Sequence, residues 1–151
     1  MEITTLPNQV LGHKTKPVPV EEIKAGKYAQ LVLDMKKSMI DNIGVGLAAN
    51  QLGQDLSIFV IDPKVALAGK VPEAYFNPEI TEYSDETDDV EEGCLSIPGF
   101  YVEIPRSKKI KFKAIDETGK KIKFKARGFL ARILQHETDH LNGATIKDRS
   151  A

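Results

Sequence analysis

The stretch Gly128-Phe-Leu-Ala-Arg-Ile-Leu-Gln-His-Glu-Thr-Asp-His-Leu141 predicts an amphipathic helix with two histidines on one face. Its apolar residues recur at helical spacing, and Gly143 follows as a stop signal. His136 and His140 are four positions apart, so both imidazoles can reach the same metal ion. Glu137 lies beside that face, where its carboxylate can reach a water molecule on the metal.

A catalytic metal site needs a third protein ligand and an open position for water. Only 11 residues follow His140, and Asp148 is the sole acid among them. Upstream, the single cysteine of the chain lies in Glu92-Gly-Cys-Leu-Ser96. A free cysteine is commonly a small buried hydrophobe, but beside a two-histidine site that lacks a ligand we favour coordination by Cys94. Thiolate and imidazole ligands favour zinc, iron or nickel over magnesium and calcium.

A third segment, Gly44-Val-Gly-Leu-Ala-Ala-Asn-Gln51, contains small residues up to its final glutamine. It is a poor match to a nucleotide-binding loop, because it lacks a third glycine and a P-loop lysine. Small residues let a backbone approach a ligand closely, and the Gln51 amide can donate a hydrogen bond to a developing oxyanion. A tight helix-to-strand connection explains the segment equally well when it is taken alone.

The remaining pattern predicts an α+β fold in a single domain over residues 1–151. One helix is expected over residues 21–42, and strands are expected at 57–62, 74–78 and 80–83, the last two separated by proline. The hexapeptides at 109–114 and 121–126 are identical and flank a turn signal, which predicts a β-hairpin. Residues 82–92 carry seven acids and are expected to form a solvated edge.

Composition and charge indicate which compartment and which partners to expect for the protein. The net charge is −1, which points to no particular class of partner. The N-terminus lacks the basic start and apolar run of a secretory signal, and no stretch approaches the roughly 20 apolar residues that span a membrane. A single cysteine forms no internal disulfide and fits a reducing compartment. We therefore expect a cytoplasmic protein with no membrane association.

Together the three segments resemble peptide deformylase. The pattern of that family is G-x-G-L-A-A-x-Q, then E-G-C-L-S, then H-E-x-D-H-L-x-G. Residues 44–51, 92–96 and 136–143 match every fixed position in the same order. Three linked motifs are far more specific than H-E-x-x-H alone.

The resemblance implies a hydrolase that removes the formyl group from the N-terminal formyl-methionine of newly made polypeptides and releases formate. It implies one divalent ion, Fe(II), which Ni, Co or Zn can replace, with Cys94, His136 and His140 as ligands. Glu137 then moves the proton, and the Gln51 side chain and the Leu95 backbone N–H stabilise the oxyanion. The implied fold is the family's α+β arrangement, in which antiparallel strands pack around the metal-binding helix.

The same resemblance predicts the residues that contact substrate, with an apolar pocket for the methionine side chain. These are Gly44, Val45, Gly46, Val90, Gly93, Phe129, Arg132 and Ile133. Arg132 lies one turn before His136. Either its head group extends to the pocket rim, which we favour, or the pocket accepts something besides methionine.

This chain resembles the short members of the family, including viral ones, that lack a C-terminal helical extension. That helix is associated with ribosome docking in bacterial members, so the resemblance does not carry that function over to this chain. The hairpin lysines share one outer face, and like charges across a hairpin are unfavourable. This indicates an anionic partner such as ribosomal RNA, although a lysine-blunted soluble edge is the simpler explanation. The chain is expected to be a monomer.

Two other functions compete with this one. A zinc endopeptidase would need a downstream ligand and an extended cleft, and the sequence supplies neither clearly. An inactive, metal-stabilised binding module would not require Glu137 or Gln51, and its ion would usually be closed off by a fourth protein ligand.

Overall fold

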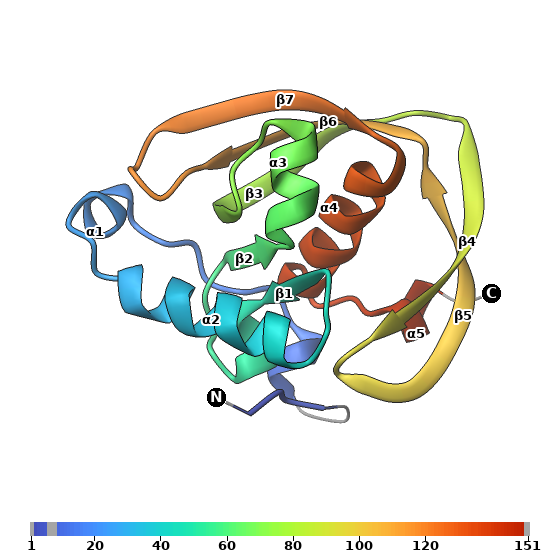
Figure 1. The fold of residues 1–151 in the computed structure, drawn as a ribbon, viewed down its shortest axis with the longest axis horizontal. Helices are drawn as coiled ribbons and strands as arrows, with labels where there is room; N and C mark the ends of the chain where they lie inside the picture. The colour runs from blue at the N-terminus through green and yellow to red at the C-terminus, as the bar shows by residue number, and fades with distance from the viewer. Residues whose placement is uncertain (1, 6–8, 150–151) are drawn as a thin grey trace.

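The computed structural model describes residues 2–5 and 9–149 (Figure 1). The helices are η1 (Gln9–Gly12), α1 (Val20–Lys24), α2 (Ala29–Asp41), η2 (Ala49–Leu52), α3 (Pro63–Gly69), α4 (Gly128–Leu141) and α5 (Ile146–Arg149). The strands are β1 (Gly46–Ala48), β2 (Ile58–Ile61), β3 (Ala74–Tyr83), β4 (Thr87–Cys94), β5 (Ile97–Ser107), β6 (Lys109–Ile115) and β7 (Lys121–Arg127). This mixture of helices and antiparallel strands confirms the α+β class.

A five-stranded antiparallel sheet in the order β1-β2-β3-β6-β7 separates two hydrophobic cores. Strand β2 explains the separation, because its side chains alternate between the two faces. Ile58 and Val60 belong to the core on the α2 side, whereas Phe59 and Ile61 belong to the core on the α4 side. All four are fully buried, which explains why the sequence reads there as an unbroken apolar run.

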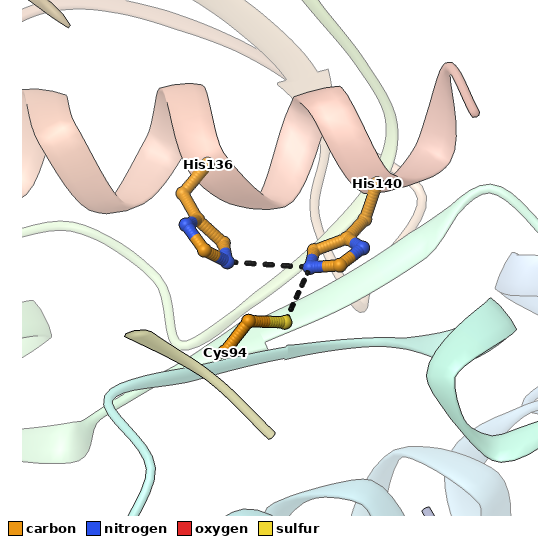
Figure 2. A group of neighbouring side chains, drawn as sticks. All are labelled: Cys94, His136 and His140. Carbon is orange, nitrogen blue, oxygen red and sulfur yellow. Dashed lines mark hydrogen bonds between the residues drawn. The ribbon is translucent and has the colours of Figure 1, made fainter. Parts of the chain in front are cut away.

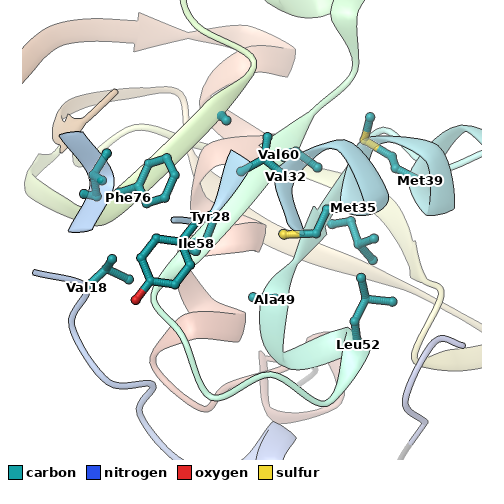
Figure 3. Close-up of a cluster of buried hydrophobic side chains, with 13 residues drawn as sticks. Val18, Tyr28, Val32, Met35, Met39, Ala49, Leu52, Ile58, Val60 and Phe76 are labelled. Atoms are coloured by element: carbon teal, nitrogen blue, oxygen red, sulfur yellow. The ribbon is translucent and has the colours of Figure 1, made fainter. Parts of the chain in front are cut away.

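The core on the α2 side is drawn in Figure 3. Helix α2 contributes Val32, Met35 and Met39, which are buried at helical spacing against Ile58 and Val60 of β2. This packing fixes the end of α2, and therefore the position of the Gly44–Gln51 segment that follows it.

Helix α4 occupies the other face of the sheet and is buried from Ala131 to Leu141, apart from the partly exposed His136. It begins and ends where the sequence predicts. Gly143 has φ +83°, a left-handed conformation that ends helices readily because glycine has no Cβ. A Cβ at this position would also lie 2.8 Å from the His13 backbone, so the glycine lets the N-terminal segment pass close to the helix end.

A second, two-stranded sheet is formed by β4 and β5, which pair over most of their length. Strand β4 ends at Cys94, so this hairpin carries the cysteine to α4. Glu92 and Cys94 are two positions apart on this strand, and their side chains contact His136 and His140 of α4.

The structure confirms the predicted hairpin as β6 and β7, with Lys111 opposite Lys125 and Lys113 opposite Lys123. Its six lysines are all exposed. Three other predictions need correction.

The helix predicted over residues 21–42 is two helices, because Gly26 adopts φ +74° and ends α1. The two short strands predicted around Pro78 are one strand, β3. The chain bends there, with Asn77 at φ +50° and a shift in register against β6, and then continues.

The acidic segment is not simply a solvated edge. Most of it forms strand β4, and Glu92 within it is buried. None of the helices in the described part of the chain combines the length and apolar character needed to cross a bilayer.

Candidate active site

Cys94, His136 and His140 bring three metal-ligating atoms together (Figure 2). The His140 Nε2 lies 3.2 Å from the Cys94 Sγ and 3.2 Å from the His136 Nε2. Ligand atoms around one four-coordinate ion, with bonds of about 2.0–2.3 Å, are separated by roughly 3.3–3.7 Å. Both distances are close to the spacing that a single ion requires, and all three atoms lie within 4.8 Å of one another. The set combines one cysteine sulfur with two imidazole nitrogens.

The charges around the site also suit a cation. His140 is buried, and burial, together with the neighbouring His136, holds its pKa well below the usual value, so it is neutral and able to ligate. Burial also lowers the pKa of His136, but hydrogen bonds to Cys94 and Glu92 outweigh it and raise this pKa to about 10. Positive charge is thus favoured at the point where the three ligands meet.

Glu92 orients His136 from the side opposite the ligand cluster. Its Oε1 lies 2.8 Å from the His136 Nδ1, which leaves Nε2 directed at Cys94 and His140. The Arg106 guanidinium donates to both carboxylate oxygens of Glu92 at 3.0 Å. A carboxylate that holds a ligating histidine in this way fixes its tautomer and increases its basicity.

Arg132 is a second partner of Glu92, and its prediction as a rim residue is wrong. The side chain is 6% exposed, and its Nη1 donates to the Glu92 carboxylate and to the Ile104 carbonyl. Its Nη2 donates to the backbone carbonyl and the carboxylate of Asp88 at 2.8 and 2.9 Å. The buried acid Glu92 and the nearby Asp88 draw the guanidinium inward, so it forms part of the floor of the site.

Glu137 lies next to the ligand cluster and is 3% exposed. Its Oε2 is 4.0 Å from the His136 Nε2, and its Oε1 is buried without a hydrogen-bond partner in the described part of the chain. Burial raises the pKa of this carboxyl to about 7. Gly46 makes the close approach of β1 feasible, because a Cβ there would lie 2.6 Å from the Glu137 Oε2. A carboxyl with a pKa near neutrality suits proton transfer.

Gln51 is buried in η2 and its amide is held in one orientation. Its Oε1 accepts from the Ala48 N–H at 2.9 Å, so the Nε2 group points toward the Ser96 hydroxyl at 3.2 Å and the Cys94 Sγ at 3.6 Å. Leu95 follows the metal-ligating cysteine in a turn, and its N–H donates to no other described residue. Both groups are therefore neutral donors beside Cys94.

A cleft of about 590 Å³ runs along this cluster. All eight predicted substrate residues line it, together with Gln51, Cys94, Leu95, His136 and Glu137. His140 lies behind them and is fully buried. Val45, Val90 and Phe129 are each close to half exposed, which gives the cleft an apolar mouth.

Several residues of the site were missed by sequence reasoning. Arg106 and Asp139 form a buried ion pair behind Glu92, and Arg149 adds two hydrogen bonds to Asp139. Asn50 donates to the His140 carbonyl at 2.6 Å and ties η2 to the end of α4. The signal that could have indicated Glu92 was its place two residues before Cys94, on the same face of a strand.

Comparisons with known proteins agree on one family. Residues 1–151 match the sequence profile of polypeptide deformylase. The peptide deformylase of Dictyoglomus turgidum is 45% identical over 150 residues, which cover 99% of this chain and 92% of that protein.

Solved structures are similar as well. The crystal structure of peptide deformylase from Thermotoga maritima has 40% identity and a TM-score of 0.88, covering 99% of this chain and 97% of that one. The Met-Ala-Ser-bound class I type b peptide deformylase from Acinetobacter baumannii has 31% identity and a TM-score of 0.88, with the same coverage. The chain therefore belongs to the polypeptide deformylase family, whose members are hydrolases that remove the formyl group from the N-terminal formyl-methionine of nascent peptides.

Proposed function

We propose that Cys94, His136 and His140 hold one divalent ion and that Glu137, Gln51 and Leu95 carry out deformylation around it. The convergence of the three ligand atoms, with the Glu137 carboxylate beside them, is the observation that carries this proposal. An ion bound there supplies a Lewis acid that acidifies a water molecule and polarises the formyl carbonyl. The catalytic unit comprises residues 1–151.

Fe(II) is the proposed native ion, with nickel, cobalt or zinc able to replace it. One thiolate and two imidazoles, which release their protons as the metal binds, form a donor set that these ions accept and that magnesium and calcium do not favour. Protein purified without oxygen should retain iron, and its activity should fall on exposure to air as iron and the Cys94 sulfur oxidise. Equal activity of zinc-loaded and iron-loaded protein would contradict the preference for iron.

Glu137 is the proposed proton carrier. It takes a proton from the attacking water and passes it to the nitrogen of the methionine as the C–N bond breaks, so that formate and a free amine are released. Its burial and its raised pKa support this role, since a carboxyl that titrates near neutral pH can both accept and donate a proton.

The formyl oxygen gains negative charge during the attack. The Gln51 amide and the Leu95 N–H are the proposed donors to this oxygen, because both lie beside Cys94 and neither carries a charge. Preorganised neutral donors stabilise an oxyanion without reorganising during the reaction.

The methionine side chain is proposed to enter the part of the cleft lined by Val90, Phe129 and Ile133. The backbone of Gly44, Val45, Gly46 and Gly93 borders the remaining length of the cleft, where a peptide can lie extended. The Met-Ala-Ser tripeptide bound by the Acinetobacter enzyme supports a short peptide of this kind as substrate.

The test is formate release from formyl-Met-Ala-Ser by anaerobically prepared, Fe(II)- or nickel-loaded protein. Glu137→Ala should abolish release while the protein keeps its metal, and Glu21→Ala, an exposed glutamate of α1, should act like the parent. A folded, metal-loaded parent that releases no formate would overturn the proposal.

We also propose that the lysine face of the β6–β7 hairpin associates with ribosomal RNA. Lys111 and Lys113 pair with Glu82 and Glu79 of β3, at 3.0 and 3.2 Å. The lysines of the edge strand β7 (Lys121, Lys123 and Lys125) are exposed and form no ion pair with any described residue. A hollow of about 440 Å³ lies on this face, lined in part by Lys109, Lys111, Lys125 and Arg127. This row of free cations fits the phosphate backbone of RNA.

Co-sedimentation with ribosomes at low salt tests the association. Glu substitutions at Lys121, Lys123 and Lys125 should reduce the bound fraction, and the same change at Lys14, Lys37 and Lys64, which are exposed elsewhere, should not. Equal binding by the two triple variants would contradict the proposal. The cytoplasmic location and the monomeric state remain predictions from the sequence.

A further inference from the structure

The guanidinium of Arg132 is fixed in the floor of the cleft by four hydrogen bonds. Nη1 donates to Glu92 and to the Ile104 carbonyl, and Nη2 donates twice to Asp88. A guanidinium has five N–H groups in one rigid plane. Four of them are used, and together they hold the plane in one orientation.

The fifth donor, the Nε–H group, remains available. It forms no hydrogen bond with any described residue, and it is not among the side-chain atoms that are both fully buried and unpartnered. Arg132 is 94% buried and is one of the residues that line the cleft. The apolar side chains of Val90, Phe129 and Ile133 line the same cleft.

We propose that Arg132 is a specificity-determining residue that donates a hydrogen bond to the first side chain of the substrate, so that the enzyme also deformylates N-terminal formyl-methionine sulfoxide. This inference rests on the proposed function, in which that side chain enters the same part of the cleft. A thioether sulfur is a weak acceptor, a sulfoxide is polar and accepts through oxygen, and the hydrocarbon chain of norleucine accepts nothing.

The chemistry favours the sulfoxide in this cleft. A polar group placed among apolar side chains is unfavourable unless it receives a hydrogen bond. A donor that belongs to a charged guanidinium makes a stronger bond than a neutral one. The reaction itself is unchanged: water cleaves the formamide C–N bond, formate leaves, and the sulfoxide takes no part, so no oxidant or reductant is needed.

Three peptides that differ only at the first side chain test the proposal: formyl-Met-Ala-Ser, its methionine sulfoxide form and formyl-norleucine-Ala-Ser. In the parent, kcat/KM for the sulfoxide should equal or exceed that for norleucine. In Arg132→Met the ratio of sulfoxide to norleucine should fall about 10- to 100-fold, the range that corresponds to one hydrogen bond to a charged group. Phe129→Leu, a change in the same cleft wall that keeps Arg132, should leave the ratio unchanged.

The ratio of kcat/KM for the sulfoxide to kcat/KM for norleucine distinguishes a specificity role from a purely structural one. Loss of the Glu92 contact alone would lower kcat/KM equally for all three substrates. If Arg132→Met fails to fold, Arg132→Lys removes the Nε donor while keeping a positive charge near Glu92, and it should lower the ratio in the same way. A parent that hydrolyses the sulfoxide tenfold more slowly than norleucine, or a variant with an unchanged ratio, would overturn the proposal.

Binding of the three deformylated product peptides, measured by calorimetry, gives the same comparison without turnover. The protein could prefer the sulfoxide product in an Arg132-dependent way and yet release no formate. That result would support the specificity role of Arg132 and count against the catalytic assignment. Formate release with no such preference in binding or in kcat/KM would leave the catalytic assignment standing and overturn the role of Arg132.

Discussion

The Oε1 of Glu92 lies 2.8 Å from the Nδ1 of His136, which makes a residue outside the ligand set part of the metal centre. Arg106 and Arg132 both donate to the same carboxylate. Arg106 also pairs with Asp139 on the helix that carries both histidines. The position of His136 is thus set from two directions, by its own helix and by strand β4.

Replacing Glu92 should therefore weaken metal binding without removing a ligand. Glu92→Gln keeps the size of the side chain but removes the charge that holds the His136 N–H. Loss of such a partner typically costs about 10- to 100-fold in metal affinity. Competition with a chelator measures the change, and Glu103→Gln, an exposed residue on the same hairpin, is the control. Unchanged affinity in Glu92→Gln would show that α4 alone positions His136.

The same carboxylate should make the metal-free protein sensitive to acid. Burial alone would raise the pKa of Glu92 from 4.5, but His136 and Arg106 outweigh burial and lower it to about 2. Because the folded pKa is below the unfolded one, the stabilisation is complete above about pH 4.5 and is lost as the pH falls toward 2. It corresponds to about 3 kcal/mol.

Urea unfolding between pH 5 and pH 2.5 measures this loss. The free energy of unfolding of the parent should fall more steeply toward acid than that of Glu92→Gln. Parallel curves would mean that Glu92 is not the group responsible.

Gly46→Ala should impair turnover while leaving the metal in place. The new Cβ would lie 2.6 Å from the Glu137 Oε2, so the carboxylate must move, and the three atoms nearest to that Cβ all belong to Glu137 rather than to a metal ligand. A displacement of about 1 Å in a catalytic group can reduce kcat about 100-fold. Formate release and metal content are measured together, with Gly12→Ala as the control, because nothing lies within 4 Å of a Cβ there. Normal turnover in Gly46→Ala would argue against Glu137 as the proton carrier.

The metal-binding helix, strand β2 and the β6–β7 hairpin could be predicted from the sequence because each has a local signal, a period in the helix and hairpin and an unbroken apolar run in β2. Apolar residues at helical spacing predicted α4, and alternating Lys with Ile or Phe predicted β6 and β7. The role of Cys94 could not be predicted from the neighbouring residues alone. Only the missing third ligand of a two-histidine site indicated that it ligates.

The ionic network behind the site could not be predicted in this way. Glu92 lies in a run of acids whose other members are mostly exposed, and its partners Arg106 and Arg132 are 14 and 40 positions away. Nothing in a local pattern distinguishes a glutamate that will meet two arginines from one that will face solvent. Arg132 was assigned to the rim for the same reason, because an isolated arginine on an apolar face usually extends toward water.

Gln51→Leu tests whether the amide acts on the transition state. The variant keeps a side chain of similar size but removes the Nε2 donor that faces Cys94, together with the acceptor that holds Ala48. Loss of one oxyanion donor usually reduces kcat by about 100- to 1,000-fold, while KM changes less because the donor acts mainly on developing charge. Gln54→Leu, at an exposed position just beyond η2, should behave like the parent. A rise in KM at constant kcat would instead mean that Gln51 binds the ground-state formyl group, and Leu95 would then be the remaining candidate for the oxyanion.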